Sequence, residues 1–155
     1  MKDDRATKFL VASFALYQVG HLLSNIVGAF TYFNSGEIPF PALPPPGGFD
    51  PHLVSTYVDM AVMDSLNAVA SLVFVLGYFS RKHWRLWLGT ITLTLSVYAA
   101  FLFNLSTYQV GAWTGGNLWS YLIINITYIP VVVLFIQVLR WGYHAARNNS
   151  QEDSR

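Results

Sequence analysis

The chain contains no cysteine, and few of its residues carry a charge. The absence of cysteine excludes disulfide bridges, thiol redox chemistry and cysteine-based zinc sites. Charged residues make up 11% of the 155 residues, against about 25% in an average soluble protein. Hydrophobic residues make up 54%, and the formal net charge is +1. This composition predicts a membrane protein, and the small net charge gives no reason to expect a nucleic-acid partner.

Four long apolar runs follow one another along the chain, at about residues 9–33, 53–79, 84–104 and 118–141. Each run is long enough to cross a hydrocarbon core of about 30 Å as a helix. The runs lack the alternation of period two that membrane strands show. The sequence therefore predicts an all-α fold, an integral membrane four-helix bundle within residues 1–147, followed by a disordered polar tail over residues 148–155.

The basic residues predict how the bundle is oriented. All nine lie in the N-terminal segment, in the short connection between the second and third runs, or in the C-terminal segment: Lys2, Arg5, Lys8, Arg81, Lys82, Arg85, Arg140, Arg147 and Arg155. Four spans place these three segments on one side of the membrane, and the positive-inside rule makes that side cytoplasmic. We therefore expect cytoplasmic N- and C-termini in a multi-pass protein of the plasma membrane or the endoplasmic reticulum.

The two remaining connections differ in composition. Six of the seven prolines lie in residues 34–52, which excludes a regular helix or a central strand there. This connection is also apolar for a loop, and its large apolar residues are Ile38, Phe40, Leu43 and Phe49. We consider two interpretations, an ordered cap over the bundle and a lid over a ligand entrance. The other connection, residues 106–117, is rich in glycine and is predicted to be flexible.

The second run carries two carboxylates, Asp59 and Asp64, and the amide of Asn67. A charge at the centre of a membrane helix costs roughly 2.5–3.5 kcal/mol, so such residues usually face a bundle interior, a wet cavity or a partner. On a helix, an arc of about 140° holds Thr56, Asp59, Met60, Met63, Asp64, Asn67 and Ser71. We expect this arc to face the bundle interior and the opposite side to face lipid, with Val58, Val62 and Val69.

Polar side chains also recur at near-helical spacing in the other three runs. They are Gln18, His21 and Asn25 in the first run, Thr90, Thr94, Tyr98 and Asn104 in the third, and Asn117, Tyr121, Asn125 and Tyr128 in the fourth. At a rise of about 1.5 Å per residue, these groups gather in the middle and the non-cytoplasmic half of the membrane. This distribution predicts an intramembrane pocket rather than a pore through the bundle.

We expect nine residues to bind a ligand in this pocket: His21, Asn25, Asp59, Met63, Asp64, Asn67, Tyr98, Asn125 and Tyr128. The same amides and hydroxyls could instead hold the helices together, at about 0.6–2 kcal/mol each. The ionisable groups favour the binding interpretation, because carboxylates are costly as helix contacts.

A haem or a metal ion is the less favoured occupant. A haem held by two histidines needs both within the membrane, and only His21 is deep, because His52, His83 and His144 lie at or beyond the ends of the runs. The set His21, Asp59, Asp64, Met60 and Met63 has no spacing that is diagnostic of a metal site. We therefore expect no cofactor and no metal.

Several of these residues belong to motifs that resemble a known family. The segment 16–21 with Tyr17 and His21, the acid Asp64 followed by Tyr78 and the basic turn before Trp84, and the segment 128–130 leading to Arg140 resemble the emopamil-binding and sigma-two receptor superfamily, often called EXPERA. The resemblance implies a four-helix bundle whose pocket takes sterols or hydrophobic amines, with an acid pairing the ligand cation. The third run has no acid, whereas the isomerase branch of that family uses one, so a binding protein is the expectation.

Three functions remain open at this stage. The first is the binding of a hydrophobic sterol-like or cationic amphiphilic ligand. The second is a membrane enzyme in which Asp64 and His21 transfer a proton or isomerise a lipid or sterol. The third is an accessory subunit whose polar faces contact another chain. The expected partners are a membrane lipid or a hydrophobic small molecule, with a second copy of the chain or another membrane subunit as the alternative.

Overall fold

Four helices make up the protein in its computed structural model, which describes residues 5–36, 43–45 and 47–152. They are α1 (Arg5–Ser35), α2 (Pro51–Phe79), α3 (Arg85–Gln109) and α4 (Asn117–Glu152), and no strand occurs among the described residues. All four are long and apolar enough to cross a membrane. The predicted all-α class is confirmed, and the chain is a multi-pass membrane protein built as a four-helix bundle.

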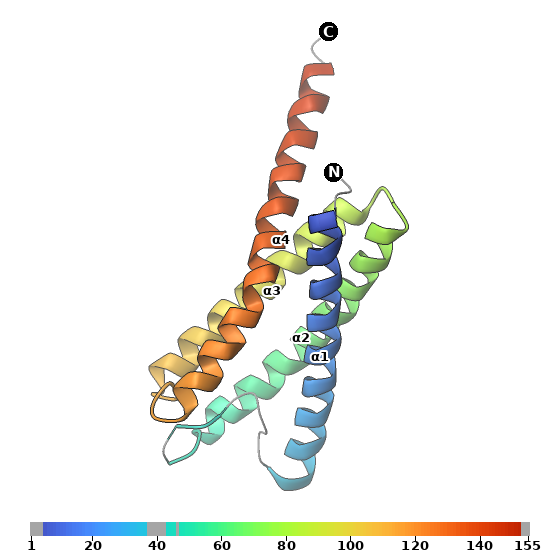
Figure 1. Ribbon diagram of the computed structural model, residues 1–155. Coiled ribbons are helices and arrows are strands. Elements are labelled where there is room, and N and C mark those ends of the chain that lie inside the picture. The colour runs from blue at the N-terminus through green and yellow to red at the C-terminus, as the bar shows by residue number, and fades with distance from the viewer. Residues whose placement is uncertain (1–4, 37–42, 46, 153–155) are drawn as a thin grey trace.

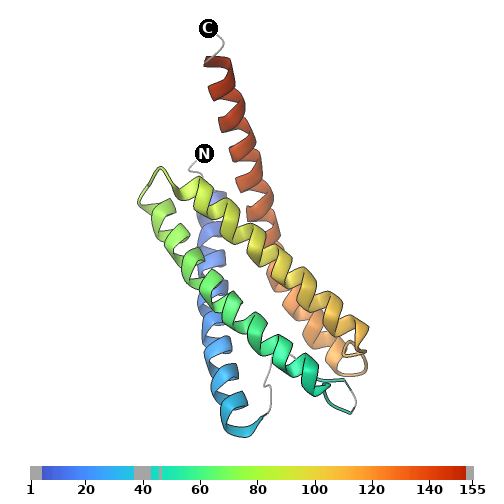
Figure 2. The same ribbon diagram turned by 180° about the vertical axis from the view of Figure 1, so that it is seen from behind.

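Each helix packs against the next one along the chain, and α1 also packs against α4 (Figures 1 and 2). Both ends of the chain lie at the same end of the bundle as the α2–α3 turn (Figure 1). We call this the basic end, because the turn carries Arg81 and Lys82 and α1 begins at Arg5. The opposite end, which holds the other two connections, is the loop end. Towards the loop end, α1 diverges from α3 and α4 (Figures 1 and 2).

The apolar core lies in the half of the bundle nearer the basic end. Its buried side chains come from all four helices and are Val11, Phe14, Phe74, Val75, Tyr78, Leu93, Tyr128, Val131, Leu134 and Val138. Phe14 of α1 and Phe74 of α2 meet with ring centroids 6.2 Å apart. Close van der Waals packing of these side chains stabilises the half of the bundle that contains few polar groups.

Two glycines allow α2 and α3 to approach closely beside their short turn. A Cβ atom on Gly77 would lie 2.4 Å from the ring of Trp84, and one on Gly89 would lie 2.5 Å from the ring of Phe74. A real Cβ atom cannot occupy either position without displacing an aromatic ring. The two helices are adjacent and antiparallel, as the shortness of the turn predicts.

The helices α3 and α4 extend further than the apolar runs indicate. α3 continues to Gln109 and leaves residues 110–116 as the connection, where Trp113 Nε1 donates to Thr107 Oγ1 at 2.9 Å. The expectation of a flexible segment from 106 onwards is therefore wrong for its first four residues. α4 continues to Glu152, so residues 148–152 of the predicted tail are helical, and 153–155 lie outside the described residues. Once a helix exists, each added residue gains a hydrogen bond, so polarity alone does not end it.

Replacing Gly89 with alanine should weaken the bundle. The added methyl group would push against Phe74, which is 1% exposed and has no free space to move into. Overpacking of this kind costs about 1–3 kcal/mol, so the melting temperature in detergent should fall. Gly142→Ala in α4 is the matched control, because nothing lies within 4 Å of its Cβ position. Equal melting temperatures for the two variants would contradict the close approach of α2 and α3.

Candidate functional site

A cavity of about 290 Å³ lies between the four helices, on the loop-end side of the apolar core. Much of its wall is apolar or small, with Ala29 from α1, Ala61 from α2, Phe103 from α3 and Ile124 from α4. α1 diverges from α3 and α4 in this part of the bundle (Figures 1 and 2). A hydrophobic molecule would find mainly apolar contacts here, interrupted by a few polar groups.

The ionisable pair His21 and Asp64 lies on the cavity wall. His21 Nε2 is 3.3 Å from Asp64 Oδ2, and their side chains are 29% and 24% exposed. Tyr17 stacks on the imidazole with centroids 5.8 Å apart and an interplanar angle of 14°. The edge of this tyrosine meets Tyr128 of α4 at 5.3 Å. The imidazole is thus covered by Tyr17, which Tyr128 of α4 contacts in turn, while the pair remains accessible from the cavity.

A second polar contact joins α1 to α2 on the loop-end side of this pair. Asn25 Nδ2 donates to the carbonyl oxygen of Ala61 at 3.2 Å and to Ser65 Oγ at 3.3 Å. The hydroxyl of Ser65 donates in turn to the carbonyl oxygen of Ala61 at 2.7 Å. These bonds fix the spacing between the helices that carry His21 and Asp64.

Three amide and hydroxyl side chains form what we call the polar floor of the cavity: Gln18, Asn67 and Ser96. Gln18 Nε2 and Asn67 Nδ2 both donate to Ser96 Oγ, at 3.1 and 2.9 Å. Asn67 Nδ2 also lies 3.3 Å from the carbonyl oxygen of Thr92. The floor joins α1, α2 and α3 about one helical turn nearer the basic end than the His21–Asp64 pair.

Three buried polar atoms near the cavity have no hydrogen-bond partner among the described residues. They are Asn67 Oδ1, Ser71 Oγ and the hydroxyl oxygen of Tyr128. Asn67 and Tyr128 line the cavity, whereas Ser71 lies behind the floor. Buried polar groups are nearly always paired, so these atoms mark places where a further polar group would be stabilised.

The α3–α4 side of the cavity is joined by a reciprocal amide pair. Asn104 Nδ2 donates to Asn125 Oδ1 at 3.0 Å, and Asn125 Nδ2 donates to Asn104 Oδ1 at 2.9 Å. Each amide also bonds to the carbonyl oxygen four residues earlier on its own helix. This pair uses its hydrogen bonds within the protein, which suits a helix contact.

Aromatic rings and the proline-rich connection cover the loop end of α2, α3 and α4. Ring contacts run in sequence through Phe49, Tyr57, Phe103, Tyr121 and Trp113. The Tyr121 hydroxyl donates to the Leu43 carbonyl oxygen at 2.8 Å, and Asn117 Nδ2 donates to that of Pro44 at 2.9 Å. The described part of this connection forms an ordered cap. Ile38 and Phe40, which the lid interpretation also uses, lie outside the described residues.

A shallow groove opens on the outside of the bundle between α1 and α4. It shares Tyr17, His21, Ser24 and Ile124 with the cavity. The remaining residues of this lateral groove are Ser13, Leu16, Gly20 and Thr127. The four shared side chains therefore separate the cavity from the lipid-facing surface of the bundle.

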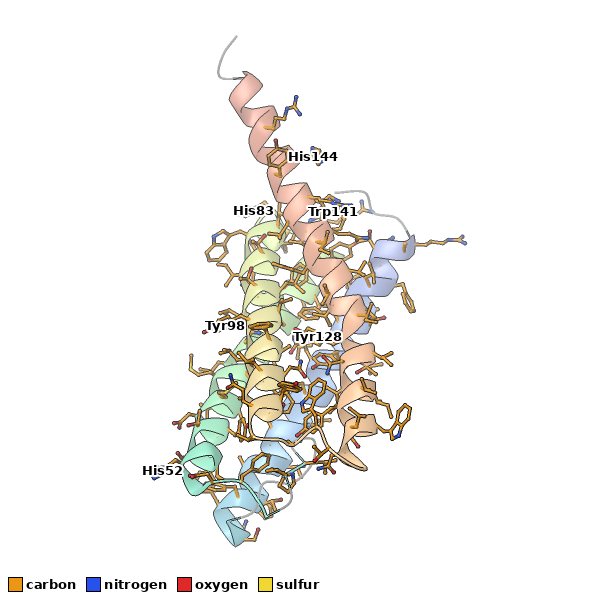
Figure 3. The ribbon with its side chains drawn as sticks, turned by 90° about the vertical axis from the view of Figure 1, so that its left-hand side faces the viewer. His52, His83, Tyr98, Tyr128, Trp141 and His144 are labelled. Carbon is orange, nitrogen blue, oxygen red and sulfur yellow. The ribbon has the colours of Figure 1, made fainter. Side chains whose placement is uncertain are left out.

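Six of the nine residues predicted to bind a ligand line the cavity: His21, Asn25, Asp64, Asn67, Asn125 and Tyr128. The expectation that Asp59 and Met63 face the bundle interior is wrong, because both are exposed on the outer side of α2. Tyr98 is 59% exposed on the outer side of α3 (Figure 3). Ligand contact by the six residues stays a prediction.

The error on α2 is one of helical phase. Its inner face runs through Tyr57, Ala61 and Asp64 to Ala68, and the predicted lipid-facing Val58 and Val62 line the cavity. The predicted arc gave weight to polar side chains, whereas small residues such as alanine are what let the helices approach. An arc weighted for small residues would have been rotated towards the observed one.

Several cavity residues gave no signal of their own in the sequence. They include Ser24, Tyr57, Ser65, Ser96 and Phe103. Serine is uninformative in a membrane helix, because its hydroxyl can bond to the carbonyl one turn earlier on any face. The spacing of Gln18 from His21 does predict Gln18. The motif in residues 16–21, which contains Tyr17 and His21, predicts Tyr17.

The other histidines do not line the cavity. His52 lies at the loop end, whereas His83 and His144 lie towards the basic end (Figure 3). In the part of the chain that the structure describes, no three His, Asp or Glu side chains are grouped so that they could hold a metal ion. The chemistry available at the cavity is that of one imidazole, one carboxylate, phenols, amides and hydroxyls.

Comparisons with known proteins leave the chain without an assigned family. No protein-family model, no curated protein and no solved structure matches it. The likeness to the EXPERA superfamily therefore stays a prediction that is based on the short motifs around Tyr17, His21, Asp64 and Tyr128. What the structure establishes is a membrane-spanning four-helix bundle with a cavity that carries one acid–imidazole pair.

Proposed function

We propose that the chain binds a hydrophobic ligand with a cationic group, such as an amphiphilic amine or a sterol-like amine, within its membrane-spanning bundle. The observation that carries this proposal is the position of Asp64, which lies with His21 on the wall of a mostly apolar cavity. An acid inside a membrane bundle is costly and usually serves a function. Only its Oδ2 atom is engaged by a side chain among the described residues.

Electrostatics favour a cationic group at this position. An ammonium about 4 Å from an ionised carboxylate gains about 1 kcal/mol in water but about 4 kcal/mol where the effective dielectric constant is about 20. His21 is neutral in its unprotonated form and then leaves the carboxylate charge uncompensated. Stacking on Tyr17 keeps the imidazole in place, so a ligand can approach Asp64 from the cavity side.

The motif residues of the EXPERA resemblance support the same proposal. Tyr17, His21, Asp64 and Tyr128 come from three helices and are brought together at one wall of the cavity. If each of these residues served only its own helix, there would be no reason for all four to lie at one wall of the cavity. We propose a relationship to that superfamily on this basis, with ligand binding rather than isomerisation as the shared activity.

Proton transfer on a lipid or sterol substrate is the second candidate function. The observation that favours it is the contact of 3.3 Å between an imidazole and a carboxylate. Tyr128 lines the same cavity, and its hydroxyl has no hydrogen-bond partner among the described residues. Groups of this kind serve as general acids and bases when they reach the reacting atom. An enzyme would turn over a lipid or sterol substrate, and the turnover would be lost in both Asp64→Asn and His21→Gln.

We also propose that the basic end faces the cytoplasm of the plasma membrane or the endoplasmic reticulum. The support comes from Arg81, Lys82 and the other basic residues at that end among those that the structure describes. Single-cysteine variants test this without background, because the natural chain has no cysteine. A cysteine at position 47 of a plasma-membrane protein should react with an impermeant thiol reagent in intact cells, and one at position 82 only after permeabilisation. The reverse pattern would refute the orientation.

Replacing Asp64 with asparagine should selectively weaken ligand binding. The substitution keeps the shape of the side chain but removes the charge, so the affinity for octadecylamine in lipid nanodiscs should fall about tenfold or more, or about 1.4 kcal/mol. The melting temperature should be kept, because asparagine keeps an oxygen that can accept a hydrogen bond from His21 and removes a charge that is costly inside a membrane bundle. Asp59→Asn is the matched control, because this acid is exposed on the outside of α2. Unaltered binding together with a lowered melting temperature in Asp64→Asn would leave the residue only a structural role.

A further inference from the structure

We propose that the polar floor of the cavity, formed by Gln18, Asn67 and Ser96, is a second subsite that binds a hydroxyl group of the ligand. This inference rests on the proposed function and narrows its ligand class. A ligand that places a cationic amine at Asp64 and a hydroxyl at the floor is a long-chain amino alcohol. The floor thus becomes the specificity-determining part of the cavity.

The floor is built from side chains that are almost fully withdrawn from the surroundings. Gln18 is 2% exposed, Ser96 7% and Asn67 9%, and the three come from three different helices. All three line the cavity, so a molecule that fills its deep end touches them. Buried polar atoms at such depth are nearly always hydrogen-bonded, so a missing partner there is informative.

The hydrogen bonds of the floor are unbalanced. Ser96 Oγ accepts N–H groups from Gln18 and from Asn67, so both of its lone pairs are used. Asn67 Oδ1 has no partner among the described residues. The amide torsion of asparagine is broad, so the Asn67 amide can rotate to turn this oxygen towards the cavity that the residue lines, exchanging its Nδ2 bond to Ser96 for a bond to the ligand. The floor therefore offers an acceptor to a group that can donate, and a ligand hydroxyl is such a group.

The separation of the floor from the acid suits a compact polar head. Asn67 lies three residues after Asp64 on α2, and Gln18 lies three residues before His21 on α1. Three residues rise about 4.5 Å along a helix. An amine and a hydroxyl on neighbouring carbons, each about 2.9 Å from its protein partner, span this separation.

The rest of the cavity suits the tail of such a molecule. Ala29, Val58 and Phe103 form an apolar wall on the loop-end side of the acid. The lateral groove between α1 and α4 lies beside this region and is separated from it by Ser24 and Ile124. A single alkyl chain can therefore stay in apolar surroundings while its polar head is held at the acid and the floor.

Three probes that differ only in their head groups test the subsite: 2-amino-1-octadecanol, octadecylamine and 1-octadecanol. Their affinities are measured in nanodiscs, with empty nanodiscs giving the partitioning into lipid. The natural chain should bind the amino alcohol about tenfold or more tightly than octadecylamine. Asn67→Leu should abolish this preference, so that the variant binds the amino alcohol and octadecylamine equally well. Ser71→Ala, which removes a neighbouring hydroxyl outside the cavity, should keep the preference.

Each contrary result has a defined meaning. Equal affinity of the natural chain for the amino alcohol and for octadecylamine overturns the subsite but leaves the proposed function standing. An equal loss of both affinities in Asn67→Leu also overturns it, because the floor then acts only as a helix junction. If none of the three probes binds to the natural chain, the proposed function fails and the subsite fails with it. Should Asn67→Leu not fold, Ser96→Ala is expected to show the same selective loss, and its absence overturns the subsite.

Discussion

The carboxylate of Asp64 imposes the main constraint on this bundle, because it lies inside helices that are long and apolar enough to cross a membrane. An ionisable group in that position needs polar neighbours, and polar side chains lie at three successive levels along α1 and α2. His21 meets the acid directly, Asn25 ties the two helices together on the loop-end side, and the polar floor follows one turn nearer the basic end. The cavity lies in the part of the bundle where these polar side chains interrupt the apolar packing.

The two halves of the bundle are stabilised by different interactions. In the basic half, Gly77 and Gly89 let α2 and α3 approach closely, and Phe74 and Leu93 belong to a continuous apolar core. In the loop-end half the helices are held by hydrogen bonds between side chains, and α1 diverges from α3 and α4. A closely packed apolar half thus supports a half in which α1 stands apart and a cavity lies between the helices. Van der Waals packing therefore stabilises the basic half, and hydrogen bonds between side chains stabilise the loop-end half.

The fold follows largely from the lengths of the apolar runs, because each run alone satisfies its backbone as a helix in a membrane. The pairing of His21 with Asp64 was foreseeable from their similar depth in adjacent spans, whereas the outward position of Asp59 was not. The prediction for α2 relied on its charged residues. The side of the helix that faces inward is instead decided by the close packing of small residues such as Ala61. The role of Ser96 as the acceptor for two amides depends on three helices at once, and no single run carries a sign of it.

Native mass spectrometry of the protein released from its own membranes tests most directly whether Asp64 anchors a ligand. The natural chain should carry one small molecule with a basic nitrogen and a long apolar part. Asp64→Asn should be released without that molecule, and Asp59→Asn should retain it. A natural chain released without any such molecule, or an Asp64→Asn variant that retains it as fully, would contradict the anchoring role of the carboxylate.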